Sequence, residues 1–222
     1  MNLLKKMIKK EDSRLNQEKI WDEISKVWKG YRIHPIPEVI NFLKNQEGKI
    51  LDLCCGSGRN LINTKGDYYG VDFSKKMISY AKEKAKEFKI KSNFKKSFAW
   101  DIPFDDNFFD SALFIDSLHC IKGSNLRYKT LKELFRVLKP GKKALITVWD
   151  KNQKSFNQEK KEVYVPWKIN EKTLKRYYYL YDKNEILDLL KKVGFKINHV
   201  STKEMPQKKY TKSIILIVDK PI

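Results

Sequence analysis

The pattern of hydrophobic positions switches repeatedly between a helical period and short apolar runs along the chain. Apolar residues three or four positions apart predict amphipathic helices, and short apolar runs bounded by turn residues predict buried strands. We expect helices near residues 20–30, 37–44, 75–88, 131–138 and 183–193. We expect strands near residues 50–53, 67–72, 93–98, 108–115, 142–149, 195–200 and 213–218. Such alternation is typical of a doubly wound α/β sheet.

Local signals mark the ends of several elements. Ser74 and Asp182 each precede a helical stripe and are expected to cap its first turn, and Gly194 is expected to end the last helix. Residues 150–175 show no clear period. A chain of 222 residues accommodates one α/β domain. We therefore predict a single domain over residues 1–222, with N-terminal helices in 1–48 and a substrate-side insertion in 150–181.

The composition adds a strong positive charge to this picture. The chain has 47 basic and 27 acidic residues, a formal net charge of +20. Such a charge favours polyanions such as RNA, although a Lys-rich chain is also typical of a general surface bias. The three cysteines form no CxxC pair, and we predict no metal site. No apolar run has the length of a signal or membrane-spanning segment, so we expect a cytoplasmic protein without membrane association.

The turn after the first predicted strand is the candidate ligand site. In "KILDLCCGSGRN", Gly56 and Gly58 leave room for a ligand beside the backbone, and Asp72 at the end of the next strand can bind a ribose diol. A pyrophosphate site requires a third glycine where this chain has Leu61. S-adenosylmethionine carries no phosphate and therefore fits better than NAD, with Asp52 as a carboxylate for its ammonium group.

Several segments carry a resemblance to a known family. "LDLCCGSG" resembles the first motif of class I methyltransferases, with Cys54 where a glycine is common. "PFDDNFFDSALFIDSLHC", "ELFRVLKPGKKALITVWD" and "VPW" followed by "RYYYLYDKNEILDLLKKVGF" resemble the tRNA wobble-uridine carboxymethyl methyltransferases. The resemblance implies a seven-stranded, mostly parallel sheet with the last strand antiparallel. It also implies methyl esterification of 5-carboxymethyluridine in the tRNA anticodon loop, with S-adenosylmethionine as cofactor.

The resemblance assigns roles to individual residues. The cofactor-binding positions are Asp52, Gly56, Gly58, Asp72, Phe98, Ala99 and Ile115. The positions expected to act on the substrate are Arg32, His119, Arg176, Trp167 and Tyr177. The adenine position departs from the family pattern, because Phe98 and Ala99 stand where an acidic residue and alanine are usual, and whether Asp101 substitutes is open. His119 fits a structural role equally well, Arg32 fits a solvated helix-end charge, and the aromatic residues also suit a strand packed on a core.

The chemistry implied by the resemblance requires positioning more than proton transfer. A carboxylate, with a pKa of ~4, is already ionised at neutral pH and attacks a methyl group without a general base. The resemblance also implies a small zinc-binding activator subunit, which would add to the third strand, "SNFKKSF", at the sheet edge. Two alternatives stay open: a small-molecule methyltransferase of the same fold, for example on a quinone precursor, and a non-catalytic cofactor- or RNA-binding subunit.

Overall fold

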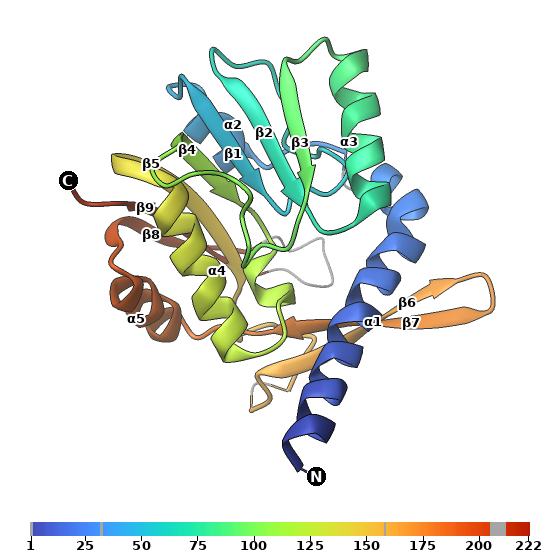
Figure 1. Ribbon diagram of the computed structural model, residues 1–222. Helices are drawn as coiled ribbons and strands as arrows, with labels where there is room; N and C mark the ends of the chain where they lie inside the picture. The colour runs from blue at the N-terminus through green and yellow to red at the C-terminus, as the bar shows by residue number, and fades with distance from the viewer. Residues whose placement is uncertain (1, 32, 158, 205–211) are drawn as a thin grey trace.

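A seven-stranded sheet in the order β3-β2-β1-β4-β5-β9-β8 forms the centre of the molecule (Figure 1). The computed structural model describes all residues except 1, 32, 158 and 205–211, and side chains from residue 17 onward. The strands are β1 (Lys49–Leu53), β2 (Asp67–Asp72), β3 (Ser92–Lys96), β4 (Phe109–Phe114), β5 (Leu138–Trp149), β8 (Lys196–Glu204) and β9 (Lys212–Asp219). Strands β1 to β5 pair in parallel, and β9 runs antiparallel to β5 and β8. The predicted sheet, with its last strand antiparallel, is confirmed.

Helices cover both faces of this sheet because side chains alternate along each strand. On one face α2 (Pro37–Leu43) packs against Ile50, Leu113, Leu145 and Ile215. On the other face α4 (Ser124–Val137) and α5 (Lys183–Val193) pack against neighbours of those residues, such as Leu51 and Ile146. The helix α3 (Lys75–Glu87) contacts β2 and β3. The doubly wound arrangement predicted from the hydrophobic pattern is therefore observed.

The predicted helix caps are confirmed. The Ser74 hydroxyl accepts a hydrogen bond from the backbone N–H of Met77 at 3.1 Å, and the Asp182 carboxylate accepts one from Asn184 at 2.9 Å. Gly194 ends α5 with φ at 114°, a backbone conformation that glycine adopts without steric cost. These caps satisfy backbone groups that a helix end leaves without an internal partner.

Three features differ from the expected pattern. Helix α1 (Asn2–Tyr31) begins well before the stripe that predicted it. The stretch expected to be irregular contains an antiparallel hairpin of β6 (Glu162–Ile169) and β7 (Lys172–Tyr179), which projects beyond α1 in Figure 1. A short 3₁₀ helix, η1 (Leu118–Cys120), follows β4. Within the described part of the chain, no helix is both long and apolar enough to cross a bilayer.

Candidate cofactor cavity

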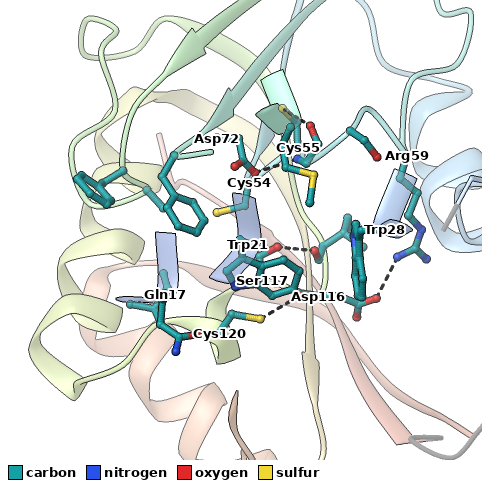
Figure 2. A pocket seen from close by; sticks show the side chains of 18 of the residues that line it. Gln17, Trp21, Trp28, Cys54, Cys55, Arg59, Asp72, Asp116, Ser117 and Cys120 are labelled. Carbon is teal, nitrogen blue, oxygen red and sulfur yellow. Dashed lines mark hydrogen bonds and ion pairs between the residues drawn. The ribbon is translucent and has the colours of Figure 1, made fainter. Parts of the chain in front are cut away.

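A cavity lies at the carboxyl ends of β1, β2 and β4, where the chain leaves the sheet (Figure 2). In parallel sheets this edge is the usual ligand position. The wall of the cavity consists of the turn after β1, the end of β2, the loop after β3 and residues that follow β4. Helix α1 adds Gln17, Trp21 and Trp28 from the opposite side. The cavity is thus enclosed by segments that are distant from one another in sequence.

The two glycines of the turn have different tasks. Gly56 lines the cavity with φ at 53°, and a Cβ atom built on it would have no neighbour within 4 Å. Gly58, with φ at 79°, faces the protein, because a Cβ atom there would lie 2.5 Å from the Leu61 side chain and 3.3 Å from the Ala81 backbone. Gly56 therefore leaves space for a ligand, whereas Gly58 permits the turn to pack against α3.

Asp72 places a buried carboxylate in the cavity wall. Its oxygens accept hydrogen bonds from the backbone N–H groups of Gly56 and Ser74, both at 2.9 Å. Burial raises the pKa of Asp72 to about 6, and these two hydrogen bonds oppose the shift. An ionised carboxylate in this position is a strong acceptor for ligand hydroxyl groups.

Asp52 lies behind the glycine turn and does not line the cavity. Its fully buried carboxylate accepts hydrogen bonds from the Tyr68 hydroxyl and from Asn60 Nδ2, the latter at 3.2 Å. Burial raises the pKa of Asp52 to about 7. Its contacts thus connect the turn to β2, and its predicted role toward the cofactor stays a prediction.

The loop after β3 supplies aromatic rings to the cavity. Phe98 stacks on Trp100 with ring centroids 4.7 Å apart and planes 10° apart, and Phe73 lies 6.1 Å from Phe98. The predicted residues Ala99 and Ile115 are buried in the same wall. Asp101 is exposed and lies outside the wall. The aromatic surface suits a flat heterocycle.

Arg176 lies beside the cavity in a cluster of indole rings. Its guanidinium carbon is 4.7 Å from the ring centroid of Trp167, 5.3 Å from Trp28 and 5.9 Å from Trp21. Trp21 and Trp28 lie seven residues apart on α1 and both reach the cavity, as Figure 2 shows. Arg176 is only 4% exposed, and no ion pair within the described part of the chain involves it. The structure thus brings the predicted residues Arg176 and Trp167 together.

The other predicted substrate residues lie elsewhere. The His119 ring is fully buried beside the stacked rings of Trp149 and Tyr178, with centroids 5.1 and 5.5 Å away, and its Nδ1 accepts a hydrogen bond from the Trp149 backbone N–H. Tyr177 is also fully buried and donates a hydrogen bond from its hydroxyl to Glu162 at 3.0 Å. Both side chains pack in the protein interior. Arg32 lies outside the described residues.

Several residues of the cavity wall were not predicted from the sequence. Arg59 and Asp116, which form an ion pair of 3.2 Å, both line the cavity without an assigned role. Trp21 and Trp28 line it as well and had no assigned role. Signals were present: Arg59 follows the glycine turn, Asp116 follows β4 at the ligand edge, and the two tryptophans share a helix face.

Comparison with known families identifies part of the chain. Residues 50–141 match the family model described as a methyltransferase domain. These residues, less than half of the chain, are therefore similar to that domain. The match covers β1 to β4, the cavity turn and the start of β5, so the predicted resemblance to methyltransferases is confirmed. It agrees with S-adenosylmethionine as the methyl donor expected for this domain.

The names of the curated proteins similar to this chain give different substrate classes. A tRNA (carboxymethyluridine(34)-5-O)-methyltransferase of Arabidopsis thaliana is 33% identical over 61% of this chain and 33% of its own length. The enzyme of that name from Schizosaccharomyces pombe is 28% identical over 79% of this chain and 86% of its own length. A 2-phytyl-1,4-naphtoquinone methyltransferase of Nostoc punctiforme is 34% identical over 60% of this chain and 54% of its own length. The chain spans about a third of the length of the animal and plant relatives that it matches.

Solved structures share the fold of this chain. A S-adenosylmethionine-dependent methyltransferase of Methanosarcina mazei superposes with a TM-score of 0.70 at 22% identity, covering 85% of this chain and 99% of its own. A Haloferax volcanii methyltransferase, solved with the Trm112 methyltransferase activator, has a TM-score of 0.70 at 16% identity. That match covers 91% of this chain and 98% of the other. The predicted class I methyltransferase fold is confirmed.

Proposed function

We propose that the chain is a S-adenosylmethionine-dependent methyltransferase that esterifies the carboxylate of 5-carboxymethyluridine at the wobble position of tRNA. The cavity residues fit this cofactor: aromatic rings at Phe98 for adenine, the Asp72 carboxylate for the ribose hydroxyls and the open turn at Gly56 beside them. When bound, S-adenosylmethionine supplies a methyl group activated by a sulfonium. The remaining requirement is a group that holds the nucleophile beside the cavity.

The observation that carries the substrate assignment is the buried guanidinium of Arg176. A buried charge without a counter-ion is costly, and the indole rings around it compensate only in part. The buried Nε atom of Arg176 has no hydrogen-bond partner among the described residues. An incoming carboxylate would complete this environment with charge-assisted hydrogen bonds. A wobble nucleoside that carries a carboxymethyl group presents such an anion, whereas a quinone ring does not.

The reaction then depends on orientation. A carboxylate with a pKa of ~4 is ionised at neutral pH, so no side chain has to remove a proton. Arg176 fixes its direction, and Trp28 and Trp167 exclude water from the reacting oxygen. Tyr31, 64% exposed and 5.5 Å from the Trp167 ring, extends the aromatic surface outward, where it can stack on an anticodon base.

A polyanionic substrate agrees with the charge of the chain. The net charge of +20 raises the local concentration of RNA and steers it toward the protein. The curated tRNA-modifying relatives support the same substrate class. The Nostoc relative favours a second candidate function, a methyltransferase of quinone precursors. Its sequence identity to this chain, 34%, is similar to the 33% of the Arabidopsis tRNA-modifying relative.

An activator subunit is part of the proposal. Strand β3 lies at the edge of the sheet and pairs with β2 on one side. Its Phe94 packs on Tyr68 in the protein's own core, whereas Asn93 and Lys95 are exposed at the edge. An edge strand offers backbone groups to a second chain. The complex of the Haloferax volcanii methyltransferase with its activator supports a partner of this kind, and we place it at β3.

The test combines a substrate assay with a matched pair of variants. Wild-type protein is incubated with labelled S-adenosylmethionine and tRNA that lacks the wobble ester, and the labelled nucleoside is identified after digestion. A parallel reaction contains a demethylated naphthoquinone. We expect label in a carboxymethyluridine ester, a loss of at least ~100-fold in Arg176→Gln, and near-normal activity in Lys175→Gln, which removes an exposed charge from the same strand. Label in the quinone alone would contradict the tRNA assignment.

A further inference from the structure

A second buried arginine lies on the side of β7 that faces away from the indole rings around Arg176. Arg127, near the start of α4, is only 5% exposed. Strand β7 contacts η1, which precedes α4 in the chain (Figure 1). Side chains alternate along a strand, so Tyr177 and Tyr179 lie on the face opposite to Arg176, where they contact Arg127. The two arginines are therefore on opposite sides of one strand.

Arg127 connects the cavity wall to β7. Its Nη1 donates a hydrogen bond to the carbonyl oxygen of Ile121 at 3.1 Å, and Ile121 lines the cavity. The same nitrogen donates to the hydroxyl oxygen of Tyr177 at 3.4 Å. The guanidinium carbon lies 3.8 Å from the centre of the Tyr179 ring. One side chain thus joins the wall after η1 to the strand that carries Arg176.

The two tyrosines extend this network to further elements. The Tyr177 hydroxyl donates to Glu162 on β6 at 3.0 Å, and the Tyr179 hydroxyl donates to Glu185 on α5. Strand β7 is therefore held on this face by groups from α4, β6 and α5. Because hydrogen bonds are directional, they fix the position of the strand more closely than apolar packing does.

Packing alone does not require a charge at this position. An apolar side chain of similar volume avoids the desolvation penalty of a guanidinium, and such replacements often leave a protein as stable as before. An apolar side chain has no donors for the Ile121 carbonyl and the Tyr177 hydroxyl. We propose that Arg127 is a positioning residue, which holds β7 against the cavity so that the Arg176 guanidinium meets the carboxylate of the substrate. This inference rests on the proposed function.

The effect of Arg127 acts through Arg176, because Arg127 does not line the cavity. A displacement of about 1 Å in an orienting group can slow a reaction by ~100-fold, so a small movement of β7 is sufficient. The competing explanation is that Arg127 only stabilises the fold. In that case its loss should reduce activity by the same factor whether or not Arg176 is present.

The experiment is a double-mutant cycle of Arg127→Met and Arg176→Gln, with kcat and KM for tRNA measured at saturating S-adenosylmethionine. We expect Arg127→Met alone to lower kcat at least ~10-fold, with the KM for tRNA and the affinity for S-adenosylhomocysteine within about 2-fold of wild type. In the Arg176→Gln background, the same change should lower kcat by less than about 2-fold. Methionine preserves the volume of the side chain, so the variant should fold. Arg127→Lys keeps a cationic donor and should have an intermediate kcat.

Arg136→Met is the matched control, because Arg136 lies on the same helix and binds Glu133 and Asp106 outside the cavity wall. It should lower the free energy of unfolding and leave kcat within about 2-fold of wild type. Equal losses of kcat from Arg127→Met in both backgrounds would assign Arg127 a purely structural role and overturn the inference. An unchanged kcat in Arg127→Met would overturn it as well. Wild-type protein that transfers no methyl group to tRNA would overturn the proposed function, and this inference with it.

Discussion

Replacement of Asp52 by asparagine should change how the stability of the protein depends on pH. Burial raises the pKa of Asp52 from 3.8 to about 7 in the folded protein. The folded state therefore binds the proton more tightly than the unfolded chain does. The stabilisation that results is complete below pH 3.8 and is lost as the pH rises through about 7. Asp52→Asn has no proton to lose and should lack this dependence.

The expected magnitude follows from the pKa difference. One pKa unit corresponds to about 1.4 kcal/mol, so ionisation of Asp52 should lower the free energy of unfolding by about 3 kcal/mol between pH 5 and pH 8. For a chain of this size, that difference corresponds to roughly 5 to 12 °C in melting temperature. Asp72, whose pKa is also raised, titrates in both proteins and largely cancels from the comparison.

Urea unfolding at half-unit steps from pH 5 to pH 8 measures the effect. The stability of Asp52→Asn relative to wild type should rise steadily over this range. Asp105→Asn, which removes an exposed carboxylate, is the control and should track wild type. Parallel curves for wild type and Asp52→Asn would refute the reasoning, because they would mean that Asp52 is ionised in the folded protein throughout the range.

Three further predictions concern ligands. S-adenosylhomocysteine should raise the melting temperature and NAD should not, because Leu61 replaces the glycine that a pyrophosphate requires. Asp72→Ala should remove most of the shift in melting temperature, and stabilisation by NAD would count against the proposed site. The affinity for tRNA should fall with salt at a log–log slope of ~0.7 to 0.9 per phosphate contact, whereas a slope near zero would indicate a general surface bias. Methylation of tRNA by the purified chain should increase when a small zinc-binding activator subunit is added, and an unchanged rate would exclude that partner.

Local patterns in the sequence were sufficient for the elements and their order. Strands such as Lys212–Asp219 contain apolar runs, and helices such as Lys75–Glu87 carry a stripe with a cap at Ser74, so each signal lies within a few residues. The edge of the sheet that binds the ligand could also be predicted, because the carboxyl ends of parallel strands meet there. Gly56, in the turn after β1, and Asp72, at the end of β2, both line the cavity at this edge.

Contacts between distant segments were decided only by the tertiary structure. The hairpin of β6 and β7 mixes aromatic and charged residues, because parts of it pack on α1 and in the core while its other residues are exposed, and this obscures the strand period. Arg176 meets Trp21 and Trp28 only because that hairpin crosses α1. His119 and Asp52 carry polar groups typical of active sites, yet packing places both in the interior. The burial of these two side chains and the pairing of Arg59 with Asp116 depend on which strands become neighbours. The order of the strands is a property of the whole sheet.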